Sequence, residues 1–293
     1  MISIQIKIKE IKPALVGYIT ESLRLLKSNQ FPNEDAVHDI RVLMKKSRAA
    51  IKLISSQVES DFYSREYGTF RDAGRILASW RETSVQRKTL KAVRKSYKEL
   101  FERLAEDSRL KEIMKKPELS ADNDSVVKKK ISELENILRR SLYRIRFYNL
   151  KSLKTLYLLQ ELEKTFIKLS ELYLYCRNNP KPAKLHTLRK RTKDFLYQLY
   201  FFRPLNPQVV KKIEKRLDGL AQNLGKYNDI TQIIDALGYR YGNAENSPEL
   251  DELIVVLKGI QDQHLIKVWP IAYKLFRPGQ NLQDLIGISN TQV

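Results

Sequence analysis

The strongest constraint on the fold is a helical pattern that occurs twice, in residues 36–53 and again in residues 183–202. In the first copy, basic residues recur at steps of three and four, which places them along one face of an α-helix. These residues are His38, Arg41, Lys45, Arg48 and Lys52. An apolar series runs beside them and consists of Val37, Ile40, Met44, Ile51 and Ile54, with Ser47 in its gap. One edge of this helix is therefore predicted to enter a core, while the neighbouring edge carries cations that repel one another and require an anion.

The second copy aligns with the first at an offset of 148 positions. The matched basic residues are His38 with His186, Arg41 with Arg189, and Lys45 with Lys193. The second basic stripe is shorter, because Asp194 and Leu196 occupy the positions of Lys46 and Arg48, although Lys190 and Arg191 add charge at its flanks. We therefore expect the first half to bind anions more strongly than the second.

A second pair of similar segments follows in the same order: GTFRDAGRI (68–76) and GKYNDITQI (225–233). Their aspartates, Asp72 and Asp229, are expected to cap helices or to orient basic side chains, rather than to catalyse a reaction. Two repeated elements in one order predict an internal duplication. The expected fold is all-α, with two four-helix bundles about a pseudo-two-fold axis and a basic central channel between them.

The rest of the chain is predicted to be helical, since glycine and proline are scarce and the breaks between apolar periods are clear. Expected helices cover 10–28, 34–57, 61–80, 84–107, 125–148, 150–177, 182–202, 207–223, 227–238 and 249–275. Asn33 is the expected N-cap of one helix, Pro182 the first residue of another, and Ser247 with Pro248 the start of the last.

The domain organisation follows from the same pass along the chain. Residues 2–8 alternate between isoleucine and polar residues, so residues 1–9 are predicted to be a short strand-like extension. Residues 10–280 form one predicted domain, with a first half of about 10–120 and a second half of about 125–280. Residues 281–293 are the predicted C-terminal tail.

The net charge of +20 predicts attraction to polyanions, and nucleic acid, anionic membrane and polyphosphate all fit at this level. A single cysteine excludes an intramolecular disulfide and a cysteine-based metal cluster. The chain shows no secretion-signal pattern and no apolar run near the ~20 residues that span a bilayer. We therefore expect a cytoplasmic protein without membrane partners.

Enzymatic activity is not expected. His38 and Asp39 resemble the HD pair of metal phosphohydrolases, but those sites need more histidines around a metal, and this chain has three histidines in all. It has no glycine-rich phosphate loop and no pattern that sets a nucleophile beside a base. We expect no catalytic residue, no metal site and no cofactor.

The segments VHDIRVLMKKSRAAIKL and LHTLRKRTKDFLYQLYFF resemble the two signature helices of the CHAD family, the histidine-containing α-helical domain, over about residues 10–275. The resemblance implies a stand-alone domain that binds inorganic polyphosphate without catalysis. Some relatives carry a triphosphate-hydrolysing domain with a Glu-x-Glu-x-Lys strand. The segment ISIQIKIKE lacks that motif, so no hydrolase activity is expected.

The candidate polyphosphate-binding residues are His38, Arg41, Lys45, Lys46, Arg48, Lys52, His186, Arg189, Lys190, Lys193, Arg140 and Arg144. Arg140 and Arg144 belong to a further basic series on 125–148, and Arg87, Lys91, Arg94 and Lys98 form another. A role in targeting or organising polyphosphate granules fits a binder that has no chemistry of its own. The alternative is a helical protein that binds nucleic acid, nonspecifically, through the same basic surface.

Overall fold

The computed structural model describes residues 8–27, 33–77, 79–115, 121–239 and 247–288, and within these ranges the regular structure is helical, without a strand. The helices of the first part are α1 (Ile11–Lys27), α2 (Glu34–Leu53), α3 (Ser60–Ile76), α4 (Ser79–Ser96), α5 (Lys98–Arg103), α6 (Ser108–Met114) and α7 (Ala121–Phe147). Those of the second part are α8 (Thr155–Asn178), α9 (Pro182–Leu199), α10 (Pro207–Tyr239), α11 (Pro248–Phe276) and α12 (Leu282–Ile286). The all-α prediction is thereby confirmed.

Three predicted helix starts are confirmed. The Asn33 side chain accepts a hydrogen bond of 2.8 Å from the backbone N–H of Ala36 at the start of α2. Pro182 is the first residue of α9, where a missing N–H costs nothing. The Ser247 hydroxyl accepts from the N–H of Leu250 at the start of α11. The first two of these starts belong to α2 and α9, the helices that carry the two basic stripes.

Some expected helix boundaries were wrong. The expected helices 207–223 and 227–238 are the single helix α10, because Leu224 and Tyr227 are buried and anchor the chain through Gly225, whose helix cost is only about 1 kcal/mol. Residues 84–107 contain most of α4 and all of α5 rather than one helix. The alternating segment 2–8 lies outside the described residues except for Ile8, and the expected tail 281–293 includes α12, whose Leu282 and Ile286 are buried.

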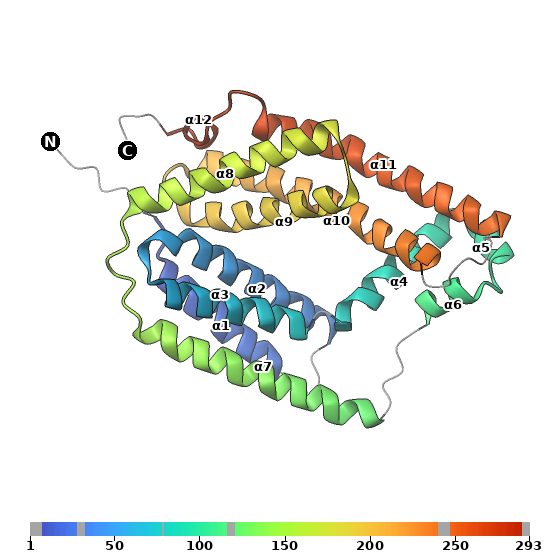
Figure 1. Cartoon of the computed structure of the whole chain (residues 1–293), viewed down its shortest axis with the longest axis horizontal. Helices are drawn as coiled ribbons and strands as arrows, with labels where there is room; N and C mark the ends of the chain where they lie inside the picture. The colour runs from blue at the N-terminus through green and yellow to red at the C-terminus, as the bar shows by residue number, and fades with distance from the viewer. Residues whose placement is uncertain (1–7, 28–32, 78, 116–120, 240–246, 289–293) are drawn as a thin grey trace.

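The helices pack in two neighbouring groups that share one main core (Figure 1). Helices α1, α2, α3 and α7 contact one another on one side, and α8, α9, α10 and α11 contact one another on the other. Helices α2 and α9 meet where the groups adjoin. The two basic segments of the sequence are therefore brought face to face.

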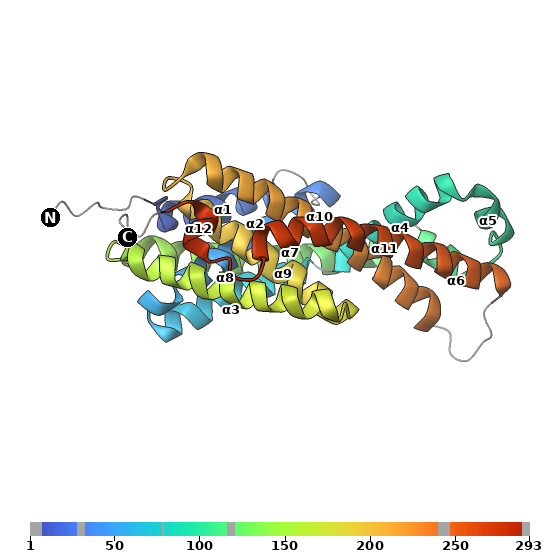
Figure 2. The same ribbon diagram turned by 90° about the horizontal axis from the view of Figure 1, so that it is seen from above.

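A smaller core lies at the far end of the molecule, where α4, α5 and α6 pack against the C-terminal part of α10 and the N-terminal part of α11 (Figures 1 and 2). Its largest side chain is Phe101 of α5, which is 4% exposed. Helix α4 also contacts α2. Residues of the first half thus pack on helices of the second half.

Arg144 of α7 is part of this scaffold rather than of a basic surface. It donates from Nε and Nη2 to the carboxylate of Glu66 on α3, which is fully buried. Ser141 donates a further hydrogen bond of 2.6 Å to the same carboxylate. Because a buried carboxylate without its partner is costly, this pair joins α3 to α7.

Replacing Arg144 by alanine is expected to lower the free energy of unfolding by roughly 3 kcal/mol, because the Glu66 carboxylate loses its main cation. Denaturant unfolding would measure this change. The matched control is Arg140→Ala on the same helix, where the side chain is exposed and the expected change is within about 0.5 kcal/mol. Equal stability of the two variants would show that the Glu66 pair contributes little.

Candidate functional site

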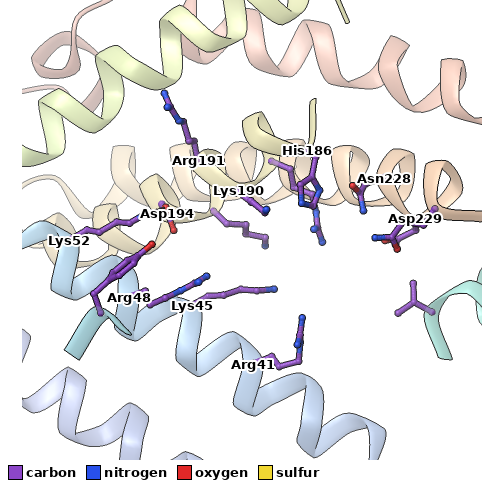
Figure 3. A pocket seen from close by; sticks show the side chains of 15 residues that line it. Arg41, Lys45, Arg48, Lys52, His186, Lys190, Arg191, Asp194, Asn228 and Asp229 are labelled. Carbon is purple, nitrogen blue, oxygen red and sulfur yellow. Dashed lines mark hydrogen bonds and ion pairs between the residues drawn. The ribbon is translucent and has the colours of Figure 1, made fainter. Parts of the chain in front are cut away.

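A cavity of about 560 Å³ lies between α2 and α9, and α3, α4 and α10 complete its walls (Figure 3). Eight of its 15 lining residues are lysine or arginine, and two are aspartate. The basic residues are Arg41, Lys45, Arg48 and Lys52 of α2, with Arg189, Lys190, Arg191 and Lys193 of α9. The others are Tyr67, Val85, His186, Asp194, Asn228, Asp229 and Gln232. The cavity therefore carries a large excess of positive charge.

The cations face this space because the apolar edge of each helix is buried elsewhere. On α2, Val37, Ile40 and Met44 are at most 3% exposed, as the apolar stripe predicted. On α9, Leu185 and Leu188 are buried in the same way. Burial of these side chains fixes the rotation of both helices, so the neighbouring basic edges cannot turn away from each other.

The cavity has a narrow end and a wide end. Helices α2 and α9 come together near Lys52 and Asp194 and diverge toward Arg41 and His186 (Figure 3). Near the narrow end, Gln198 of α9 donates a buried hydrogen bond of 3.2 Å to the carbonyl of Ala49 on α2. At the wide end, Asn228 and Asp229 of α10 face the space. A ligand can therefore reach further between the helices from the wide end.

Two of the lining cations near the narrow end are paired with carboxylates. Lys52 Nζ lies 2.5 Å from Asp194 Oδ2, which links α2 to α9. Lys193 Nζ lies 2.8 Å from Asp218 Oδ1, and Gln222 of α10 donates to the other oxygen of that carboxylate. The positive charge is thus largely compensated at this end.

Three other lining cations are not paired in this way. Among the described residues, no ion pair involves Arg48, Arg189 or Lys190. The Nε atom of Arg189 is buried and has no hydrogen-bond partner. A buried guanidinium donor without an acceptor costs free energy, and an anion in the cavity would supply that acceptor.

The backbone of the neighbouring helices positions two of the arginines. Arg41 Nη1 donates to the carbonyl of Gly74, in the last turn of α3, at 2.7 Å. Arg189 lies against Gly225 of α10, where a Cβ would come within 3.1 Å of Nε. Glycine at this position therefore leaves the room that the Arg189 guanidinium occupies, whereas the matched residue Gly68 has no neighbour within 4 Å of such a Cβ.

His186 stands in the same positive field. Burial lowers the pKa of His186 below its ordinary value, Lys190 lowers it further, and a hydrogen bond with Asn228 acts in the opposite direction. Arg189 and Lys45 add smaller lowering effects. These effects favour the neutral imidazole, whereas an anion bound nearby would favour its protonated form.

The comparison with protein families decides the family. A family model described as the CHAD domain matches residues 18–238, which is most of the chain. This chain belongs to the CHAD family. Searches of curated proteins and of solved structures gave no match. In the part of this CHAD protein that the structure describes, no helix is long and apolar enough to cross a membrane.

The CHAD domain brings together eight of the twelve candidate residues. Arg41, Lys45, Arg48, Lys52, His186, Arg189, Lys190 and Lys193 line the cavity. Four do not. His38 is half-buried on α2 but is not a lining residue, and Lys46 lies with Nζ 5.8 Å from the ring centre of Tyr18 on α1. Arg140 is exposed on α7, and Arg144 is bound to Glu66. Lys46 does not line the cavity because it is one position past the cavity face of α2. Arg140 and Arg144 do not line it because α1 and α3 separate α7 from the cavity.

Sequence reasoning missed the contribution of α10. Asn228, Asp229 and Gln232 lie three, four and seven positions after Gly225, so they share one helical face with it. This spacing could have predicted from the sequence that the three residues lie on one face of a helix. Asp72 and Asp229 were expected to cap helices or to orient basic side chains, and the first of these roles is excluded because both residues lie inside helices. Asp72 does orient basic side chains, since Arg71 and Arg75 donate to it.

Replacing Lys190 by glutamine is expected to raise the pKa of His186 toward its ordinary value, because one neighbouring cation is removed. NMR titration of the imidazole protons would measure the change in the unliganded protein. His264 is the internal control. Burial, then Lys226 and Lys267, lower its pKa, so the Lys190 variant should leave it unchanged. A His186 pKa that does not move would contradict the charge coupling between these residues.

Proposed function

We propose that this CHAD protein binds inorganic polyphosphate, without catalysis, in the cavity between α2 and α9. The observation that carries the proposal is the buried Nε of Arg189, which has no acceptor inside a cavity lined by eight lysines and arginines. Such an arrangement is unfavourable when empty, because like charges repel and a buried donor lacks a partner. A bound polyanion removes both costs.

The spacing of the cations suits a ligand whose charge repeats. Arg41, Lys45 and Arg48 recur along α2 at about one helical turn, roughly 5.4 Å. Polyphosphate presents charged oxygens on every unit, so successive units meet successive cations. Arginine can bind two oxygens at once, and lysine adjusts as a point charge, so the combination holds a flexible chain without requiring one exact register.

Single-stranded nucleic acid fits the same cavity less well. Proteins that bind it combine positive charge with aromatic side chains on which bases stack. Tyr67 is the one aromatic residue among those that line the cavity. The lining therefore favours a chain of phosphates without bases. Nonspecific binding of nucleic acid to the outer basic surface is a separate expectation and depends strongly on salt.

The internal duplication is part of this proposal. The two groups of helices, α1, α2, α3 and α7 against α8 to α11, would be related four-helix bundles about a pseudo-two-fold axis. The paired positions Arg41 and Arg189 on α2 and α9, which both line the cavity, support this relation. The cavity would then be the site where one ancestral basic helix faces its own copy.

The absence of catalysis is supported by the roles of the lining side chains. Asp194 is paired with Lys52, and the imidazole of His186 adjoins Asn228 and cations rather than a nucleophile. A general base must lie within hydrogen-bond reach of the group that it deprotonates, whereas Asp194 contacts the ammonium group of Lys52 and His186 adjoins an amide side chain. A binder of this kind acts through location, so we propose a cytoplasmic role in targeting or organising polyphosphate granules.

The test is competition binding at near-physiological salt, with labelled long-chain polyphosphate against duplex DNA, single-stranded RNA and tripolyphosphate. Wild type is expected to prefer long-chain polyphosphate. Arg189→Gln should weaken its binding roughly tenfold or more, because a guanidinium that can bind two phosphate oxygens at once is lost. Arg140→Gln is the matched control: it removes the same charge from the exposed face of α7 and should bind as wild type does.

The same variants also separate the site from general surface charge. If RNA competes as well as polyphosphate, or if both arginine variants lose affinity equally, binding is diffuse and the proposed function is wrong. Thermal unfolding without ligand serves as the folding check. Arg189→Gln should be at least as stable as wild type, since it removes an unpartnered buried donor.

A further inference from the structure

The lining cations differ in how they are compensated, and the difference follows the shape of the cavity. At the narrow end, Lys52 is held by Asp194 and Lys193 by Asp218. Along the rest of the cavity, Arg48, Arg189 and Lys190 take part in no ion pair among the described residues. Lys52 and Lys193 are therefore neutralised by carboxylates, whereas Arg48, Arg189 and Lys190 keep their positive charge.

The structure assigns to Asp194 the role of a stop: we propose that it neutralises Lys52 and so closes the narrow end of the cavity to phosphate. Asp194 thereby limits how many phosphate units the cavity can hold. This inference rests on the proposed function, because it concerns the extent of the same anion site. It makes Asp194 a residue that determines chain-length specificity.

The geometry supports a stop rather than a flexible contact. The Asp194 side chain is 17% exposed, and its Oδ2 lies 2.5 Å from Lys52 Nζ. Lys52 also lies over the ring of Tyr67, with Nζ 5.5 Å from the ring centre. The pair thus sits in a partly buried, packed corner, where Coulomb interactions are screened less than at the surface.

A phosphate that reached Lys52 would have to displace this carboxylate or accept its repulsion. Comparison of the two repeats shows that this carboxylate is present in only one of them. Position 194 matches Lys46 of the first copy, so α9 carries an acid where α2 carries a base. On α2, Lys46 faces α1 and Tyr18, whereas on α9 Asp194 faces the cavity. One substitution between the copies therefore changes the net charge of the narrow end.

The experiment measures the affinity of wild type and Asp194→Asn for tripolyphosphate, a medium-chain and a long-chain polyphosphate. Asparagine keeps the size of the side chain and can still accept a hydrogen bond from Lys52. The variant should bind the longer chains roughly tenfold more tightly, with a smaller change for tripolyphosphate, because a repulsive charge is removed and Lys52 becomes available. The slope of log affinity against log salt concentration should become steeper by about one, because one more phosphate charge is neutralised by the protein.

Two further variants make the result specific. Asp39→Asn gives the same change in net charge on an exposed residue of α2, half a turn away from the face of Arg48, and should bind as wild type does. The double variant Lys52→Gln/Asp194→Asn replaces a neutral pair by another neutral pair. Its affinity for long chains should return to that of wild type within about threefold.

The opposite outcome is equally clear. If Asp194 orients Lys52 for the ligand, Asp194→Asn will weaken binding of long chains, and the double variant will bind less tightly than wild type. Either result would overturn the inference while wild-type binding still supports the proposed function. If wild type does not bind polyphosphate at all, the proposed function itself fails. Should Asp194→Asn unfold, Asp218→Asn tests the same idea through Lys193, since it must also tighten binding of long chains.

Discussion

The structure depends on the burial of apolar edges that forces two cationic edges to face each other. Each of α2 and α9 contributes a row of fully buried side chains to the main core, including Ile40, Met44 and Leu188. Burying a side chain of this size contributes roughly 1.5–3 kcal/mol, which exceeds the few tenths of a kcal/mol that each like-charge contact costs along a helix. The hydrophobic effect thus holds the basic rows in a position that electrostatics alone would oppose.

The same opposition underlies the proposal that the cavity binds an anion. A cavity whose cations were all paired would gain little from a ligand, and one without any pairing would be harder to fold. Here Asp194 and Asp218 pair with Lys52 and Lys193, while Arg48, Arg189 and Lys190 take part in no ion pair among the described residues. Stability and binding are therefore divided along the length of one cavity. The glycine at position 225 completes the arrangement by giving the Arg189 guanidinium its space.

Local patterns predicted much of this organisation. The periodicity of residues 36–53 and 183–202 was sufficient to identify which edges are buried and which are basic, and Asn33 and Pro182 gave the helix starts. The partners of those edges were harder to predict. Arg144 resembled a channel residue because its helix has a basic series, but its cation is used by Glu66, which is distant in sequence. Periodicity describes one helix at a time, whereas ion pairing depends on which helices meet.

The same limit explains Asp194. In the sequence it shortens a basic stripe, and the expectation was a weaker second half. In the folded chain it reaches across to Lys52 of the first half, so its effect falls on both walls. The helices α2 and α9 contribute equal numbers of lysines and arginines to the cavity. Stronger anion binding by the first half, which the longer basic stripe of residues 36–53 predicts, stays a prediction.

The most direct test of the account is a crystal structure of the protein with medium-chain polyphosphate. The account predicts phosphate units between α2 and α9, within hydrogen-bond distance of Arg48 and Arg189, with Arg189 Nε donating to a phosphate oxygen. It would be contradicted by an occupied outer surface, for example along α7, with the cavity left empty of phosphate.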